Sequence, residues 1–268
     1  MLNLKSISKV SIPLDGSDLA SSALPWATLI SSAARASVHL VGVLESEENQ
    51  ENRDLLLDYL ERTESELEKR TSKVSIHTLE GNAPKEIAEQ ARIEKSDLIV
   101  MASHSRTGVL TRLLGSVSFW VLRFTTVPVM IVKPESGDAT VRKILYPVDG
   151  STPSEEGLSL AAGLSSILTI PLYLFHVTES GYKAPKHVEC SMSALRELGT
   201  EVELIVRQGN PKERITELVN SESGILTVLG SETATGIDVV KMGSVAEHLF
   251  ANTIMPTIVV PKKPYPRY

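Results

Sequence analysis

The segment from Ala102 to Ser118 carries residues that could bind a phosphate group. It reads ASHSRTGVLTRLLGSVS, in which small residues lead to Gly115-Ser116-Val117, the expected start of a helix. The free N–H groups and the positive dipole end of a helix N-terminus attract anions, and small residues let a backbone approach them closely. Arg106 and Arg112 add positive charge. The alternative is a surface loop whose arginines are simply solvated.

Two further residues could complete a nucleotide site. Asp15 follows the apolar run at Lys9–Leu14, where a carboxylate can accept hydrogen bonds from ribose hydroxyls. Asp15-Gly16-Ser17 also suits a turn and a helix cap, and the two roles are compatible. Val43 ends the next apolar run and could pack on a purine, although a β-branched residue there is also ordinary core.

The same landmarks recur in the second half of the chain, which indicates a tandem repeat. VSIPLDGS at 10–17 returns as ILYPVDGS at 144–151, so that Asp149 and Val177 each follow Asp15 and Val43 by 134 residues. GNAPKEI at 81–87 returns as GNPKERI at 209–215, and Gly115-Ser116-Val117 returns 128 residues later as Gly243-Ser244-Val245.

The second copy of the loop is less suited to a polyanion. It reads GSETATGIDVVKMGSVA from Gly230 to Ala246, with Glu232 and Asp238 against Lys241. An acid facing a triphosphate is unfavourable even in a wet site. We therefore expect the first copy to be the better nucleotide site.

Each copy alternates short β-rich runs with helical patterns, which is typical of a parallel sheet covered by helices. In the first copy we expect five strands, at about Lys9–Leu14, Val38–Leu44, Lys73–Leu79, Asp97–Ala102 and Val129–Val132. We expect four helices: one capped by Ser17 and kinked at Pro25, one over Asn52–Arg70, one from Pro84, and one from Gly115-Ser116 to about Phe124. The polar segment Pro134–Thr140 is the expected linker. Ligands of such sheets bind beyond the carboxyl ends of the strands, where the strand order reverses.

On these motifs the chain resembles the universal stress protein family, whose members carry a loop of the form G-x2-G-x9-G-[S/T] after the fourth strand. The first copy matches it with Ala102, Ser105, Gly115 and Ser116, and the second with Gly230, Thr233, Gly243 and Ser244. The first glycine is replaced in the first copy, and the second glycine in both. The resemblance implies an α/β fold of two tandem, doubly wound, five-stranded parallel-sheet domains (adenine nucleotide alpha hydrolase-like) at 1–134 and 141–268, paired as a pseudo-dimer through their last strands.

The resemblance further implies ATP as the ligand, with magnesium, Asp15 at the ribose and Val43 at the adenine. The full set of expected binding residues is Asp15, Val43, Ala102, Ser105, Gly115, Ser116, Val117, Asp149, Val177, Gly230, Gly243 and Ser244. The expected function is a stress-response regulator that binds ATP, more in domain 1 than in domain 2, with little or no turnover. The alternatives are a nucleotide-free interaction scaffold of the same fold and an enzyme that activates a substrate with ATP. A homodimer of chains is a further expectation.

The composition of the chain and the motifs that it lacks argue against several other functions. A net charge of −6 and a pI near 5.6 argue against a nucleic-acid surface. The single cysteine, Cys190, is expected to be at least partly buried; it allows no internal disulfide, which favours the cytoplasm. No apolar run suggests a membrane span, and the sequence has no P-loop or dinucleotide motif. Histidines are scattered, so no metal site is expected, and no catalytic constellation is visible.

Overall fold

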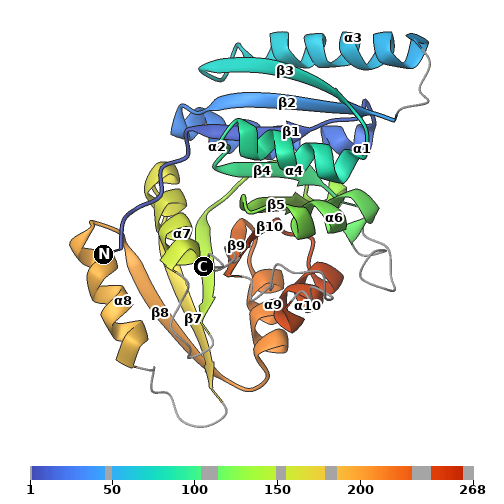
Figure 1. Cartoon of the computed structure of the whole chain (residues 1–268). Helices are drawn as coiled ribbons and strands as arrows, with labels where there is room; N and C mark the ends of the chain where they lie inside the picture. Colours follow the sequence, from blue (N-terminus) through green and yellow to red (C-terminus); the bar gives the residue numbers. More distant parts are fainter. Residues whose placement is uncertain are drawn as a thin grey trace, which may run out of the picture. The chain divides into compact units, whose positions relative to one another are not determined.

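The protein is described here by a computed structural model that covers residues 2–45, 50–103, 114–148, 155–178, 186–230 and 243–261 (Figure 1). The chain divides into two compact units: Ile7–Ala139, and Thr140–Tyr268 together with Met1–Ser6. We call them the first and the second unit. The domain limits drawn from the sequence, 1–134 and 141–268, stay a prediction about which segments fold independently.

The first unit contains a parallel sheet with the strand order β3-β2-β1-β4-β5. Its strands are β1 (Lys9–Pro13), β2 (Ser37–Leu44), β3 (Lys73–Glu80), β4 (Leu98–Ala102) and β5 (Val129–Val132). Successive strands move outward from β1 to β3, and the chain then returns to place β4 on the other side of β1. This reversal of direction between β1 and β4 is the switch point at which such sheets bind ligands. The expected α/β fold with five parallel strands is therefore confirmed.

The helices of the first unit are α1 (Asp18–Ser21), α2 (Leu24–Ala34), α3 (Gln50–Leu67), α4 (Ala83–Ile93) and α6 (Ser116–Phe124), followed by the 3-10 turn η1 (Pro134–Ser136). Ser17 caps α1 as expected, its side chain accepting a hydrogen bond from the N–H of Ala20. The expectation of one helix kinked at Pro25 is wrong. Two helices form instead, and Pro25 lies in the first turn of α2, where its missing N–H costs nothing.

Side chains of β2 alternate between two helical layers. A Cβ at Gly42 would touch Leu56 and Leu60 of α3, so Leu40 and Gly42 face α3. His39, Val41 and Val43 consequently face the other side of the sheet, where α4 packs on β2. This row of three residues under α4 positions both of the sites described below.

The second unit repeats this arrangement with the strand order β10-β9-β6-β7-β8, all pairs being parallel. Its strands are β6 (Lys143–Val148), β7 (Leu172–Thr178), β8 (Val202–Gln208), β9 (Ile225–Gly230) and β10 (Thr257–Val260). Its helices are α7 (Glu155–Leu168), α8 (Lys186–Glu197), α9 (Pro211–Ser221) and α10 (Ser244–Asn252). Cys190 on α8 is exposed, so the expectation that it is at least partly buried is wrong.

The N-terminal segment belongs to the second unit, although it precedes β1 in the chain. The N–H of Lys5 donates to the carbonyl oxygen of Ser159 at 3.0 Å. A Cβ at Gly163 would lie 2.0 Å from the carbonyl oxygen of Lys5. Glycine at this place on α7 therefore lets the N-terminal segment lie against the helix.

The core of each unit forms where the sheet meets its helices. The strands β1, β4, β5 and β10 are almost entirely buried, as expected when helices cover both faces of a parallel sheet. The largest fully buried side chains include Trp26, Ile30, Leu40 and Ile99 in the first unit. In the described ranges, no helix combines the length and apolar character needed to cross a bilayer.

Candidate functional site

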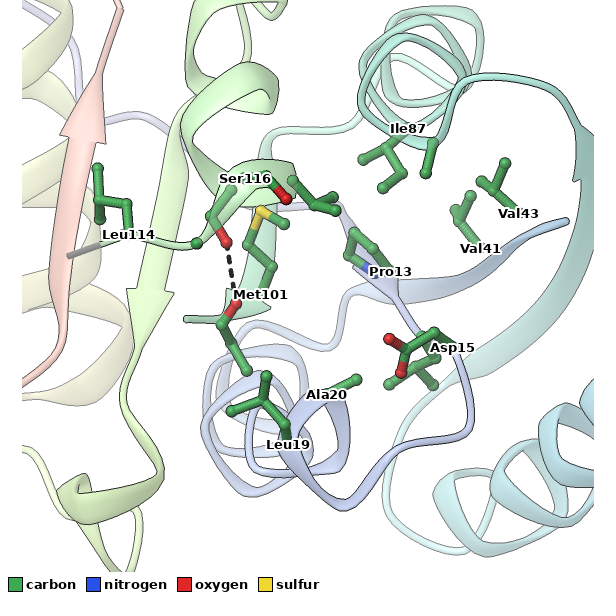
Figure 2. A pocket seen from close by; sticks show the side chains of 16 residues that line it. Pro13, Asp15, Leu19, Ala20, Val41, Val43, Ile87, Met101, Leu114 and Ser116 are labelled. Atoms are coloured by element: carbon green, nitrogen blue, oxygen red, sulfur yellow. Dashed lines mark hydrogen bonds between the residues drawn. The ribbon is translucent and has the colours of Figure 1, made fainter. Parts of the chain in front are cut away.

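A pocket of about 230 Å³ opens at the switch point of the first unit. It lies beyond the carboxyl ends of β1, β2 and β4 and is closed by the first turns of α4 and α6 (Figure 2). Its lining consists of Pro13, Leu14, Asp15, Leu19, Ala20, Val41, Val43, Ala83, Ile87, Met101, Ala102, Leu114, Gly115, Ser116, Val117 and Ser118. Pockets for whole drug-sized ligands have about 300–1,000 Å³, so this one fits part of a ligand that extends beyond it.

One wall of the pocket is apolar. Val41 is buried and Val43 is half-buried on β2, and Ile87 approaches them from α4. Figure 2 shows these three side chains together on one side of the pocket. Leu19 and Met101 add to the apolar lining. A planar aromatic ring with little charge suits such a wall, because its burial removes apolar surface from water.

Asp15 places a carboxylate at the edge of this pocket. Its Oδ1 accepts hydrogen bonds from the N–H of Ser17 at 3.0 Å and from the Ser17 hydroxyl at 2.6 Å. The other oxygen, Oδ2, has no partner among the described residues, and the residue is exposed. Asp15 therefore organises the turn before α1 with one oxygen and leaves the other for a ligand, so the two roles expected from the sequence are compatible in this geometry.

The N-terminus of α6 faces the same pocket. Phe119 is the first residue of this stretch whose N–H reaches back, to the carbonyl oxygen of Gly115 at 3.2 Å. The N–H groups of Ser116, Val117 and Ser118 have no partner among the described residues, as is usual for the first turn of a helix. Such groups, at the positive end of the helix dipole, suit an anion.

The entry into α6 depends on a glycine. Gly115 has φ 69° and ψ 156°, a region of backbone space that is essentially restricted to glycine. Just before it, Leu114 is fully buried and anchors the chain in the core. The Ser118 hydroxyl donates to the carbonyl oxygen of Ala102 at 3.0 Å, which ties the start of α6 to the end of β4.

The structure brings together six of the binding residues expected from the sequence: Asp15, Val43, Ala102, Gly115, Ser116 and Val117 all line the pocket. Ser105 and Asp149 lie outside the described residues, as do Arg106 and Arg112. In the second unit, Val177 is half-buried on β7, Gly230 ends β9 and is exposed, Gly243 caps α10, and Ser244 begins it.

Sequence reasoning missed the part of the pocket that α4 provides. Ala83 and Ile87 belong to the motif GNAPKEI, which marked the repeat but was not assigned to the site. Its recurrence after the third strand of both copies was the available signal, since the start of that helix lies at the same edge of the sheet as Asp15. Ser118 was missed too, because a serine inside a helix gives no sign of its partner.

The first unit contains a group of potential metal ligands that the sequence analysis did not bring together. His39, His77 and Glu94 each offer a ligand atom, and these atoms all lie within 4.8 Å of one another. The two histidines are 38 positions apart and only the pairing of β2 with β3 brings them together.

The duplicated doubly wound fold, with a pocket at the switch point of its first unit, defines an α/β protein of the Rossmann-like class. Residues 6–133 and 182–261 match the sequence profile of the universal stress protein family. The universal stress protein MJ0531 of Methanocaldococcus jannaschii is 34% identical over 138 residues, which cover 47% of this chain and 81% of that protein. The chain therefore belongs to the universal stress protein family.

Solved structures agree on the fold. A universal stress protein from Archaeoglobus fulgidus superposes with a TM-score of 0.80 at 20% identity, covering 95% of this chain and 98% of that one. A protein of unknown function from Pseudomonas aeruginosa, PA1789, superposes with a TM-score of 0.70 at 19% identity, covering 96% and 93%. At these identities the likeness supports the two-unit architecture and says nothing of the ligand.

Proposed function

We propose that the first unit binds an adenine nucleotide, with ATP as the ligand, at the pocket beyond β1, β2 and β4. The adenine ring would pack against Val41, Val43 and Ile87, and the ribose hydroxyls would donate to Oδ2 of Asp15. The phosphates would extend over the N–H groups that begin α6. The observation that carries this proposal is one apolar pocket with a spare carboxylate oxygen on one side and unpartnered helix N–H groups on another.

The loss of the first loop glycine does not count against this proposal. Ala102 lies within β4 and is absent from the described non-glycine residues with positive φ, so its backbone needs no glycine. Gly115, in contrast, keeps a backbone conformation that other residues rarely adopt. The glycine that the local geometry requires is thus the one that the sequence retains.

Slow turnover or none fits the composition of the pocket. Among the described lining residues, Asp15 is the single ionisable side chain. Its Oδ1 is engaged by Ser17, and in-line attack on a phosphate needs a base or a positioned water near the far end of the ligand. We therefore infer a regulator in which bound ATP, accompanied by Mg²⁺, biases the conformation or the partners of the protein in a stress response.

The competing function is a nucleotide-free scaffold that keeps the fold for protein contacts. The replacement of glycine by Ser105 in the loop favours it. The two functions differ in one measurable property, because a scaffold neither copurifies with adenine nucleotide nor binds it after purification. Pairing of the two domains through their last strands, a homodimer of chains and a cytoplasmic location stay predictions.

Titration calorimetry on nucleotide-stripped protein tests the proposal. Asp15→Asn keeps an amide oxygen that can accept from Ser17 but replaces the spare carboxylate oxygen with a donor. Because hydrogen bonds to charged groups contribute about 1.5–3 kcal/mol, we expect ATP affinity to fall by about tenfold or more. Asp18→Asn is the matched control, since Asp18 is exposed in the first turn of α1 and does not line the pocket.

The two variants separate a binding role from a folding role. ATP binding that falls in Asp15→Asn at unchanged thermal stability, and persists in Asp18→Asn, supports the proposed site. The nucleotide function is wrong if the native chain releases no adenine nucleotide on denaturation and gives no binding heat at millimolar ATP. That result would leave the scaffold function.

A further inference from the structure

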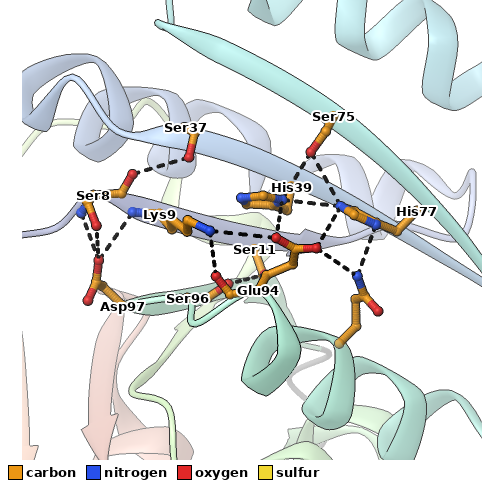
Figure 3. Close-up of polar contacts among 11 residues, drawn as sticks. Ser8, Lys9, Ser11, Ser37, His39, Ser75, His77, Glu94, Ser96 and Asp97 are labelled. Carbon is orange, nitrogen blue, oxygen red and sulfur yellow. Dashed lines mark hydrogen bonds and ion pairs between the residues drawn. The ribbon is translucent and has the colours of Figure 1, made fainter.

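A second cluster of polar side chains lies in the first unit, away from the nucleotide pocket. It consists of His39 on β2, His77 on β3 and Glu94, which ends α4 (Figure 3). His39 Nδ1 lies 3.2 Å from His77 Nε2 and 3.6 Å from Glu94 Oε2, and His77 Nε2 lies 3.8 Å from Glu94 Oε1. Two imidazole nitrogens and a carboxylate thus converge on one small volume.

Strand register and helix length create this convergence. In the parallel ladder of β2 and β3, His39 pairs with Ser75 and Val41 pairs with His77. The two histidines therefore lie on the same face of the sheet, offset by two residues along the strands. This is the face covered by α4. Glu94 is the C-cap of that helix, so its carboxylate approaches the histidines from the side of the sheet that α4 covers. Every recorded polar contact of His39 is made at Nδ1, the nitrogen that faces the cluster.

We propose that His39, His77 and Glu94 bind a zinc ion, with His39 Nδ1, His77 Nε2 and a Glu94 carboxylate oxygen as ligands. A tetrahedral zinc with bonds of about 2.0–2.1 Å holds its ligand atoms about 3.3–3.4 Å apart. The 3.2 Å between the two imidazole nitrogens is close to this value, and each nitrogen has one of the two Glu94 carboxylate oxygens within 3.8 Å. Octahedral ions of similar bond length need neighbouring ligands nearer about 3 Å, so four-coordinate zinc fits better.

The fourth position is beside Ser75. Its hydroxyl oxygen lies 3.0 Å from His39 Nδ1 and 3.3 Å from His77 Nε2, separations of the same size as those between the ligands. The hydroxyl can therefore hold a zinc-bound water or approach the ion itself. A site with three protein ligands and one exchangeable position is a familiar zinc arrangement.

Burial and the helix dipole both act on this cluster. Burial lowers the pKa of His39, although the Glu94 carboxylate opposes this effect, and the His77, Lys9 and Lys73 charges add to it. The C-terminal end of α4 carries the negative end of the helix dipole, which favours a cation at this place.

Two neighbours modulate the site. The Gln90 side-chain nitrogen lies 2.9 Å from His77 Nδ1, the nitrogen that does not face the cluster. With zinc at Nε2 the proton of His77 is on Nδ1, so the Gln90 amide would turn over and orient the imidazole by accepting from Nδ1–H with its oxygen. Lys9 Nζ donates to the main-chain oxygen of Glu94 at 2.8 Å and lies 3.7 Å from Glu94 Oε2. The ammonium group therefore neutralises the carboxylate when no metal is bound and competes with the metal for it.

At the equivalent place in the second unit, the lysine and the glutamate recur but the two histidines do not. The repeat places Lys143 at the position of Lys9 and Glu222 at that of Glu94, and these two side chains form an ion pair. Tyr173 stands in place of His39, and its ring lies 5.0 Å from Lys143 Nζ; Ile205 stands in place of His77. The Lys–Glu pair is common to both units, whereas the imidazoles belong to the first.

Zinc at this place would join the edge strand β3, its neighbour β2 and the end of α4. The other end of α4 provides Ala83 and Ile87 to the nucleotide pocket. The ion would thus fix the helix that forms part of that pocket wall. The zinc proposal does not depend on nucleotide binding, because its ligands are distinct from every residue that lines the pocket.

The test uses the full chain, free of a polyhistidine tag and treated with a chelator that is then removed. Zn²⁺ binding is measured by competition with a chromophoric chelator, and Co²⁺ serves as the spectroscopic probe, since tetrahedral cobalt absorbs visible light far more strongly than six-coordinate cobalt. We expect one Zn²⁺ per chain, an intense cobalt spectrum, and a higher thermal midpoint with Zn²⁺ than without it.

Three of the substitutions below introduce the residue that the second unit has at the equivalent position, so the same fold already accommodates it. His39→Tyr, His77→Ile and Glu94→Gln should each weaken Zn²⁺ binding by more than about 100-fold, and Gln90→Leu, which introduces the residue found at Leu218, by about 10–100-fold. His248→Ala and Glu222→Gln are the controls, a histidine and a carboxylate of the second unit, and should bind Zn²⁺ as the native chain does.

Lys9→Met distinguishes a loss of Zn²⁺ binding through the site from a loss through misfolding. Removing the competing ammonium group should tighten Zn²⁺ binding by at least about tenfold, because the ammonium group and Zn²⁺ repel each other by more than about 1 kcal/mol even at the dielectric constant of bulk water. Damage to the fold does not strengthen a site, so tighter binding supports the proposal. Native protein that fails to bind Zn²⁺, or binding that is equally strong in His39→Tyr and His77→Ile, would overturn it.

Discussion

Gly115 and Gly243 begin the same Gly-Ser-Val motif in the two units, but their backbones differ. Gly115 has φ 69° and ψ 156°, whereas Gly243 has φ −56° and ψ 140°, which any residue can adopt. The difference is local, since the glycines that precede α4 and α9 keep the same conformation, with φ 136° at Gly81 and 129° at Gly209. The motif alone therefore does not determine how the chain enters the helix.

A second difference lies under α4 and α9. Both units keep a lysine on the first strand and a glutamate at the end of the third long helix, Lys9 with Glu94 and Lys143 with Glu222. In the first unit the carboxylate also meets two imidazoles, and in the second the lysine lies over Tyr173. Duplication has thus kept the charge pair and changed the side chains around it. The first unit carries both candidate binding sites.

Replacing the two motif glycines tests the first difference and should give the largest effect on stability. Gly115→Ala forces a Cβ into a conformation that costs about 1–3 kcal/mol, whereas Gly243→Ala should stay within about 0.5 kcal/mol of the native chain. Urea unfolding measures both. ATP affinity should fall in Gly115→Ala alone, because the start of α6 is displaced from the pocket.

Equal destabilisation by Gly115→Ala and Gly243→Ala would contradict the backbone difference. The comparison would then reduce to a difference in side chains, and the argument that the first unit retains its required glycine for ligand binding would lose its structural basis.

Gly163→Ala tests the way in which the second unit holds the N-terminal segment, and its net effect should be smaller. The new Cβ would meet the carbonyl oxygen of Lys5, so the segment before β1 must move away from α7. Overpacking costs about 1–3 kcal/mol, but alanine gains about 1 kcal/mol over glycine inside a helix. We expect a net loss of up to about 2 kcal/mol and faster proteolysis within the first residues of the chain.

A double-mutant cycle provides the control. In a chain that lacks residues 1–6, the Cβ of Gly163→Ala meets no backbone, and the substitution should be neutral or stabilising. A loss of the same size in both backgrounds would show that the N-terminal segment is not the cause.

The sequence predicted the strands and the ligand end of the first sheet well. β5 and α6 have the predicted limits, because Pro128 and Gly115-Ser116 mark their starts. Asp15, Val43 and Gly115 meet in one pocket because the carboxyl ends of parallel strands share one edge. The break between α1 and α2 was missed. The Ser22 C-cap leaves no strong mark in the sequence, and four apolar residues at helical spacing run across the break: Leu19, Ala23, Ala27 and Ile30.

The histidine cluster could not be derived from spacing. His39 and His77 become neighbours through the register of β2 and β3, and Glu94 joins them because α4 ends where it does. A shift of one residue in that register would send His77 to the opposite face of the sheet. The comparison of the two copies offered the one usable signal: histidine replaces tyrosine and isoleucine at positions that face the same helix.

The smallest predicted effect concerns the charge pair of the second unit. Lys143 and Glu222 are partly exposed, with side-chain exposures of 24% and 44%, so solvent screens their attraction. Glu222→Gln should lower the free energy of unfolding by about 0.5–1 kcal/mol at low salt and by less in 1 M salt, as urea titrations at the two salt concentrations would record.

In chelator-treated protein, Glu94→Gln should lower the free energy of unfolding by no more than this, because Lys9 can still donate to the main-chain oxygen of Glu94. With Zn²⁺ present, the two substitutions should separate: stability should respond to the ion in Glu222→Gln and not in Glu94→Gln. If the two variants behave alike with and without Zn²⁺, the imidazoles have added no function to the charge pair that both units share.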